Sequence, residues 1–233
     1  MDEIKSIAEL LKIDLSQVTP QNDAEIAEIE RRQREAERTE RYRKQVPERY
    51  WKESLDTYRT DTAERKAAAE KARAFVQCAR QGGFQTLLFL GSVGTGKTHL
   101  ACGIVRETGG LYRLAPAIAE EIRRAKSFSA KETEADILDY YGHASLLVID
   151  EIGRGIAAAE EQYMLYQIIN ERYNRRKPTV LISNQTKTEF LKYVGTAAAD
   201  RLTESARAVE FTGKSYRAEL RLGGAVNDRP TGV

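Results

Sequence analysis

The sequence predicts an α/β fold in which helices cover a parallel sheet, preceded by a helical N-terminal extension. Two observations support this prediction. From residue 87 onward, short apolar runs typical of buried strands alternate with longer segments of helical periodicity, and strands separated by helices pair in parallel. Residues 22–45, by contrast, are almost entirely polar, which is typical of an exposed helix outside a core.

The composition limits the class of protein. The 233 residues suit one domain of ordinary size plus an appendage, and 41% hydrophobic with 31% charged residues provide a core and a charge-rich surface. A net charge of +2 does not commit the whole chain to nucleic acid, although a local basic patch stays open. Cys78 and Cys102 are predicted to be reduced thiols, and the two cysteines and two histidines form no metal site at the usual spacings.

Hydropathy predicts the cellular location. No apolar run approaches membrane-spanning length. The N-terminus also lacks the apolar stretch of a signal peptide. The sequence therefore predicts a cytoplasmic protein that makes no membrane contact.

The first fifty residues form the predicted extension. Residues 1–20 include an amphipathic stretch that is too small to bury its own stripe, so it either docks on its own domain or binds a groove on a partner. Its apolar positions are Ile4, Ile7, Leu10 and Leu11. Residues 22–45 carry acid-first pairs such as Glu30 with Arg34, and we interpret them as a solvated helical spacer, with contact to a DNA backbone as the alternative.

A linker and a long helix come next. Residues 48–60 contain the only tryptophan and two tyrosines, which are predicted to pack the linker against the following domain. A helix is predicted from Thr62, its cap, to about Gln81, where two glycines end it. Its expected inward residues are Ala63, Ala67, Ala74, Phe75 and Cys78.

Residues 91–98 match the phosphate-loop motif G-x-x-x-x-G-K-[ST], between a predicted strand over 87–90 and a helix from Lys97 to about Glu107. Glycines allow the backbone to approach a ligand closely, so that loop amides and the helix N-terminus face an anion. Lys97 supplies charge for the β- and γ-phosphates, and Thr98 offers a hydroxyl to Mg²⁺. A glycine-rich turn without a ligand is the alternative.

The alternation continues beyond this helix. The expected strands cover 111–114, 145–150, 179–183 and 208–211, and the expected helices cover 116–126, 132–141, 157–175, 188–193 and 196–204. The strand over 145–150 ends in Asp150 and Glu151, the acidic pattern that follows a buried strand in nucleotide-hydrolysing proteins. Asp150 is predicted to hold Mg²⁺ and Glu151 to activate the attacking water. Asn184 follows the next strand, where it either aligns that water or is an ordinary turn residue.

These motifs, in this order, resemble the DnaC/DnaI family of bacterial helicase loaders, which are AAA+ ATPases. The resemblance covers roughly residues 55–220. The stretches that carry it are Gly-Ser-Val-Gly-Thr-Gly-Lys-Thr-His-Leu (91–100), Leu-Leu-Val-Ile-Asp-Glu-Ile-Gly (146–153), Ile-Ser-Asn (182–184), Asp-Arg-Leu (200–202) and Ser-Tyr-Arg (215–217). The IstB-type transposition helper ATPases share nearly all of these stretches and are the close competitor.

The resemblance implies a Rossmann-like P-loop domain of the AAA+ type over 51–220, after the extension over 1–50 and before a flexible tail over 221–233. It implies ATP and Mg²⁺ as cofactors, with Thr98 and Asp150 as metal ligands. The implied catalytic residues are Lys97, Glu151, Asn184 (sensor 1), Arg201 (an arginine finger reaching a neighbouring subunit) and Arg217 (sensor 2). The implied nucleotide contacts are Gly91, Ser92, Val93, Gly94, Thr95, Gly96, Lys97, Thr98, His99 and Asp150.

Two departures from the family pattern are visible. The segment 195–199, just before Arg201, lacks the charges that are usual there, which weakens the expectation of a normal contact between subunits. Residues 1–50 do not resemble the loaders' helicase-binding domain and carry no cysteine cluster. A loader encoded by a phage or prophage, with an N-terminus of its own, fits both observations.

The function implied is ATP-dependent loading of a DnaB-type replicative helicase hexamer onto single-stranded DNA, with self-association of the ATPase domains and the N-terminal segment as the helicase contact. A single-strand surface is expected over 115–141, where basic residues surround an aromatic, or else this is a solvated helix face. Its residues are Arg113, Arg123, Arg124, Lys126, Lys131 and Phe128. The alternatives are a transposase helper on double-stranded DNA and a nucleotide-gated adaptor with negligible turnover.

Overall fold

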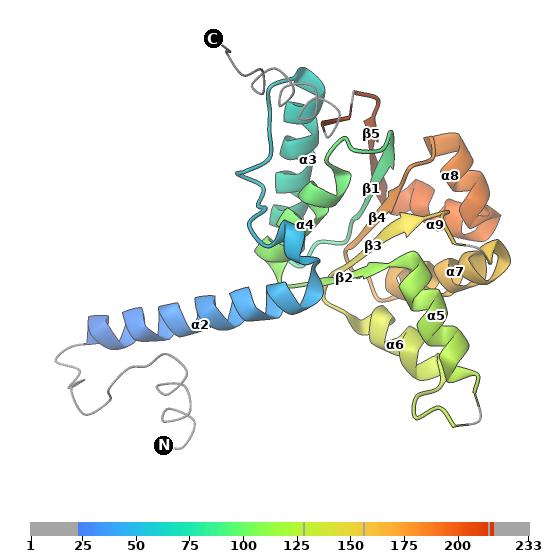
Figure 1. Cartoon of the computed structure of the whole chain (residues 1–233), viewed down its shortest axis with the longest axis horizontal. Helices are drawn as coiled ribbons and strands as arrows, with labels where there is room; N and C mark the ends of the chain where they lie inside the picture. The colour runs from blue at the N-terminus through green and yellow to red at the C-terminus, as the bar shows by residue number, and fades with distance from the viewer. Residues whose placement is uncertain (1–22, 128, 156, 214, 217–233) are drawn as a thin grey trace, which may run out of the picture. The chain divides into compact units, whose positions relative to one another are not determined.

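The structure, a computed structural model, describes residues 23–127, 129–155, 157–213 and 215–216. The predicted amphipathic stretch over 1–20 and the tail over 221–233 lie outside these residues. Within them, five parallel strands form one sheet in the order β2-β3-β4-β1-β5, which confirms the predicted α/β class (Figure 1). The strands are β1 Thr86–Gly91, β2 Leu111–Leu114, β3 Leu147–Ile152, β4 Thr179–Ser183 and β5 Ala206–Phe211.

Helices cover both faces of the sheet. The described helices are α2 Asp23–Gln45, the short η1 Glu48–Tyr50, α3 Ala63–Arg80, α4 Lys97–Thr108, α5 Ala115–Ala125, α6 Glu134–His143, α7 Ala158–Asn174, α8 Lys187–Val194 and α9 Thr196–Ser205. Helices α3 and α4 lie on one face, and α5 to α9 lie on the other (Figure 1). By contact, the chain divides into two compact units, residues 1–44 and residues 45–233.

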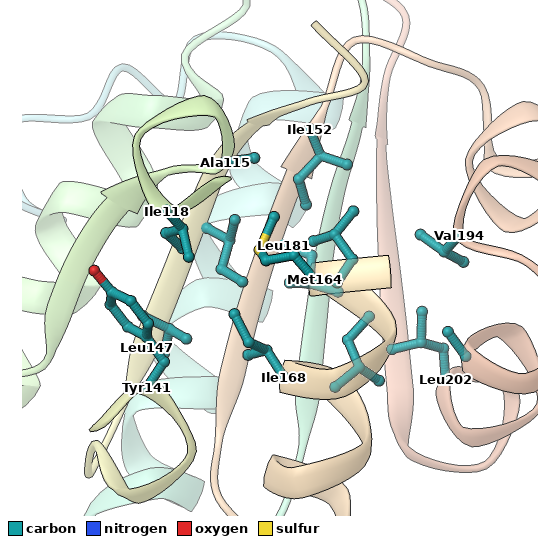
Figure 2. Close-up of a cluster of buried hydrophobic side chains, with 14 of the residues drawn as sticks. Ala115, Ile118, Tyr141, Leu147, Ile152, Met164, Ile168, Leu181, Val194 and Leu202 are labelled. Carbon is teal, nitrogen blue, oxygen red and sulfur yellow. The ribbon is translucent and has the colours of Figure 1, made fainter. Parts of the chain in front are cut away.

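The strands are apolar because the sheet is buried on both faces. Side chains alternate between faces along each strand, so Leu147 and Leu181 point toward α5 to α9, where Ile118, Met164 and Ile168 pack against them (Figure 2). Phe89, on the opposite face, is fully buried and contacts the ring of Phe211 edge-on. Burial of these apolar side chains on both faces stabilises the sheet.

Several element ends differ from the sequence prediction by one or two residues, and two elements, β3 and α3, differ in ways that matter for the site and the core. Strand β3 begins at Leu147 and continues through the acidic pair to Ile152, with a register shift against β4 that puts Glu151 at a φ of 60°. Helix α3 buries Ala68, Ala69, Ala72, Phe75 and Val76, so only Phe75 was correctly placed, while Ala63, Ala67 and Ala74 are exposed. An alanine-rich helix has no strong apolar stripe, so its sequence fixes its rotation poorly.

Residues 48–60, the linker, pack against the following domain as predicted. Leu55 and Tyr58 are buried, and the Arg106 guanidinium donates to the carbonyl of Trp51 at 3.0 Å. A Cβ on Gly103 of α4 would lie 2.8 Å from Leu55 Cδ2, so the linker packs directly on this helix.

In α2, the expected Glu30–Arg34 ion pair is present at 3.1 Å. Both cysteines are free thiols, as expected. Among the residues described, no helix is long and apolar enough to cross a membrane.

Arg172 is the largest fully buried side chain of the described core. It donates to the carbonyls of Tyr141, Ala144 and Pro178 at 2.6, 2.9 and 2.7 Å and to Thr179 Oγ1 at 2.8 Å. Burial lowers its pKa to about 9, which leaves the guanidinium charged at neutral pH. The cation therefore ties the end of α6 to the start of β4.

We predict that Arg172→Met lowers the free energy of unfolding by about 3 kcal/mol, because it leaves several buried carbonyls unpaired. Urea denaturation of the full chain measures this. Arg124→Met, at a side chain that is 77% exposed, is the control and should change the midpoint little. If Arg172→Met lowered the free energy of unfolding as little as Arg124→Met does, the stabilising role of Arg172 would be contradicted.

Candidate nucleotide site

A cavity of about 400 Å³ lies at the carboxyl ends of β1, β3 and β4. In a parallel sheet of this kind, ligands bind at these strand ends. The cavity is lined by the loop residues 93–99, by Asp150, Glu151 and Asn184 at strand ends, by Arg154, by linker and helix residues Arg49, Tyr50, Glu53, Thr57, Tyr58, Arg59 and Arg65, and by Tyr216. The structure thus brings most of the predicted site residues together.

The phosphate loop has a backbone conformation that favours glycine at specific positions. Gly91 and Gly94 have φ values of 108° and 79°, in the left-handed region. A Cβ on Gly94 would lie 2.2 Å from Ser215 Oγ, and one on Gly91 would lie 2.3 Å from the carbonyl oxygen of Phe211. The loop is therefore packed against the segment after β5, and α4 begins directly at Lys97 with its N-terminus toward the cavity.

Lys97 is a desolvated cation held by the loop itself. Its side chain is 5% exposed, and Nζ donates to the carbonyls of Gly91 at 2.7 Å and Ser92 at 2.6 Å. Burial lowers the pKa of Lys97 to about 8, and Asp150 opposes this shift. An anionic phosphate would be a stronger partner for this ammonium than the two carbonyls are.

Asp150 is a buried acid of the cavity with three hydrogen-bond donors. It is 4% exposed, and its Oδ2 accepts from Thr98 Oγ1 and from Tyr112 Oη, both at 2.8 Å. Its Oδ1 accepts from the amide of Glu151 at 2.6 Å. Three donors hold the carboxylate and connect the phosphate loop, β2 and β3.

The donor set around Asp150 fits Mg²⁺. Because the Thr98 hydroxyl gives its hydrogen to Asp150, its oxygen lone pairs stay available to a cation. No group of three or more His, Cys, Asp or Glu side chains among the described residues could hold a metal alone. One hydroxyl and one carboxylate, completed by phosphates and water, are a usual arrangement for Mg²⁺.

Glu151 lies on a backbone bulge that neighbouring elements fix. The Ser183 hydroxyl donates to the carbonyl of Ile152 at 2.8 Å, and the amide of Gly153 donates to Glu161 Oε1 at 2.6 Å. Glu161 itself is 1% exposed. The Glu151 carboxylate is left partly exposed on the cavity wall, with Oε1 at 3.6 Å from the Arg154 guanidinium.

His99 lines the cavity, but its ring contacts the linker. Nε2 lies 2.9 Å from the carbonyl oxygen of Ser54, and Nδ1 lies 3.1 Å from Glu53 Oε2. The ring also meets Tyr58 edge-on, with centroids 5.3 Å apart. The first turn of α4 is therefore joined to the linker.

Sequence reasoning missed Tyr112 and the side chains that close the outer end of the cavity. Tyr58 Oη donates to the carbonyl of Thr95 at 3.4 Å, and the amide of Tyr216 donates to the carbonyl of Gly94 at 2.9 Å. The Arg59 guanidinium lies 5.0 Å from the Tyr216 ring. The aromatic content of the linker was the one signal that pointed to this role.

The two predicted arginines are placed differently. Arg201 does not line the cavity: it donates to the carbonyl of Ala197 at 2.9 Å and lies over the rings of Tyr166 and Tyr173, at 5.8 and 5.9 Å. Its position on α9 leaves a role toward a neighbouring subunit as a proposal. Arg217 lies outside the described residues.

The sheet order, the phosphate loop and the acidic end of β3 define an ATP-binding P-loop protein of the AAA+ class. The chain belongs to the family described as IstB-like ATP binding protein, whose model matches residues 23–223.

Similar proteins include both kinds that the sequence resembled. The replicative helicase loader DnaC of Escherichia coli (strain K12) is 30% identical over 172 residues, which cover 72% of this chain and 70% of DnaC. A putative ATP-binding protein of insertion sequence IS5376 from Geobacillus stearothermophilus is 32% identical over 149 residues, 59% of this chain and 58% of that protein. The crystal structure of the DnaC helicase loader superposes with a TM-score of 0.62 at 21% identity, covering 71% of this chain and all of that one.

We predict that nucleotide affinity weakens as pH rises above about 8, by up to about tenfold per pH unit, because free Lys97 then loses its proton and binding must restore it. Fluorescence titration with an ATP analogue between pH 7 and 9.5 measures this. Lys97→Arg is the control, since its guanidinium stays charged and its affinity should be insensitive to pH. A wild-type affinity that is equally insensitive would show that Lys97 is not the titrating group.

Proposed function

We propose that this protein is an ATP-dependent helicase loader that acts in the cytoplasm. It binds a DnaB-type replicative helicase hexamer through residues 1–50 and delivers the helicase to single-stranded DNA. ATP binding favours the assembled state and hydrolysis favours release. The observation that carries the proposal is one cavity that combines a phosphate loop with an acidic pair and is walled by the linker leading to the N-terminal unit. The similarity to DnaC supports this choice of partner.

In the proposed chemistry, each residue positions charge or water. Lys97 and the loop amides bind the phosphates, while Thr98 and Asp150 hold Mg²⁺, which neutralises charge developing on the phosphate oxygens. Glu151 accepts a proton from the attacking water. Asn184, which follows β4 and lines the cavity, aligns that water.

Arginines complete the proposed site. Arg201 acts in trans on the γ-phosphate of a neighbouring copy, which requires it to leave its contact with Ala197. Arg217 contacts the nucleotide in cis. Self-association through the ATPase domains would then make hydrolysis depend on assembly.

The linker offers a route from nucleotide to helicase contact. Arg49, Tyr50 and Glu53 line the cavity. They lie directly before or within the segment 51–54, which His99 and Arg106 of α4 contact. A nucleotide that reorders these side chains would change where the linker leaves the ATPase domain. This supports a switch that acts on the N-terminal unit.

The expected DNA surface on α5 is partly neutralised. Arg123 and Arg124 both pair with Glu120, and Lys126 lies 3.6 Å from Glu134. Arg113 is half-buried and donates to Gln45 Oε1 at 2.6 Å, so it is not part of this surface, while Phe128 lies outside the described residues. We retain the C-terminal end of α5 as the proposed contact for a single strand, because Arg123, Arg124 and the C-cap residue Lys126 are each more than half exposed.

The second candidate function is an ATPase that assists a transposase on double-stranded DNA. The family match and the insertion-sequence relative favour it specifically. A preference for duplex over single-stranded DNA, with filaments or rings along the duplex, would distinguish this function from helicase loading.

We predict that the full chain forms a complex with its host's replicative helicase when ATP is present, and that deletion of residues 1–44 abolishes the complex. Size-exclusion chromatography with light scattering measures both. Lys97→Ala, which removes the phosphate-binding cation, should behave as the full chain does without ATP. No complex with the intact chain under any nucleotide would overturn the loader function and favour the transposase helper.

A further inference from the structure

Tyr112 is a buried tyrosine that contacts Asp150, one of the residues that line the nucleotide cavity. It lies on the short strand β2, paired with Val148 of β3, and it is 5% exposed. Leu114 pairs with Asp150, so Tyr112 is two residues away on the same face of the sheet as that acid. Its hydroxyl donates to Asp150 Oδ2 at 2.8 Å.

Packing alone does not require this hydroxyl. A phenylalanine would fill nearly the same volume beneath the sheet, and burying a hydroxyl is unfavourable unless it finds a partner. The partner here is a carboxylate, which makes the hydrogen bond charge-assisted. The hydroxyl therefore acts on Asp150 more than on the core.

Tyr112 is one of three hydrogen-bond donors that determine which oxygen of Asp150 stays free. A carboxylate has about four acceptor positions. Thr98 Oγ1 and Tyr112 Oη together occupy Oδ2, and the Glu151 amide occupies one position of Oδ1. The remaining acceptor position is on Oδ1. Without Tyr112, only the Thr98 hydroxyl on Oδ2 and the Glu151 amide on Oδ1 would orient the carboxylate, so its orientation would be less tightly fixed.

We propose that Tyr112 is a positioning residue for Mg²⁺: it fixes the Asp150 carboxylate so that Oδ1 is the oxygen left for the ion or its bound water. This rests on the proposed function, because Mg²⁺ binding is part of it. Groups that orient a metal ligand typically change metal affinity tenfold or more when they are removed.

The test is Tyr112→Phe in the full chain, with a fluorescent, non-hydrolysable ATP analogue as the probe. The Mg²⁺ concentration that half-saturates the metal-dependent gain in affinity should rise about tenfold. Affinity in EDTA should stay within about twofold of the wild type, since Lys97 and the loop amides are untouched. Circular dichroism should show a fold like that of the wild type.

Tyr141→Phe is the matched control. Tyr141 is also a buried tyrosine, and its hydroxyl donates to the carboxylate of Glu121, which does not line the nucleotide cavity. Tyr141→Phe removes a comparable hydrogen bond and should leave the Mg²⁺ dependence of nucleotide affinity unchanged.

The possible outcomes distinguish Mg²⁺ binding, which is part of the proposed function, from the positioning role of Tyr112. A wild type whose nucleotide affinity ignores Mg²⁺ would remove the metal from the proposed function. A wild type that responds to Mg²⁺, with Tyr112→Phe responding identically, would overturn the positioning role alone. Equal losses with and without Mg²⁺, or a Tyr112→Phe chain that does not fold, would also overturn it by assigning Tyr112 a structural role.

Discussion

The buried carboxylate of Asp150 is the group on which the rest of the site depends. A carboxylate that is only 4% exposed needs hydrogen-bond donors around it. The structure supplies three, from the phosphate loop, from β2 and from the adjacent amide. Thr98 lies on α4 and Tyr112 on β2, so the pairing of β2 with β3 and the start of α4 must both be correct for Asp150 to keep these two donors. The nucleotide site therefore forms only when these elements of the fold are in place.

The same geometry connects the two ends of the cavity. At the phosphate loop, Lys97 donates to two loop carbonyls and Thr98 donates to the buried Asp150. The outer end consists of the linker, where Tyr58 reaches the carbonyl of Thr95 and His99 reaches the carbonyl of Ser54. A ligand that spans the cavity would touch both ends. Under the proposed function, such a ligand would connect an event at the phosphates with the linker.

The sequence predicted the sheet and most elements because apolar runs and phosphate-loop spacing are local signals. Strand β4 has the predicted bounds, and α4 ends one residue beyond its prediction. The bulge at Glu151 could not be predicted, since it depends on the register of β3 against β4. Tyr112 was missed for the same reason: only strand pairing shows that it faces Asp150.

The roles of individual arginines are less accessible to sequence reasoning. A motif places Arg201 in a helix but does not say which neighbours hold its guanidinium, and in the structure these are Tyr166, Tyr173 and a carbonyl of its own helix. The face of α3 was misjudged because alanine packs on either side of a helix at similar free energy.

ATP binding and ATP hydrolysis by the wild type and by Glu151→Gln, with helicase and single-stranded DNA present, test the assigned site. We expect the variant to keep its affinity for ATP within a few-fold and to hydrolyse ATP about 100-fold more slowly, because only the proposed proton acceptor is lost. A variant that hydrolyses ATP at the wild-type rate would contradict the assignment of the site. A wild type without turnover would make the protein a nucleotide-gated adaptor instead.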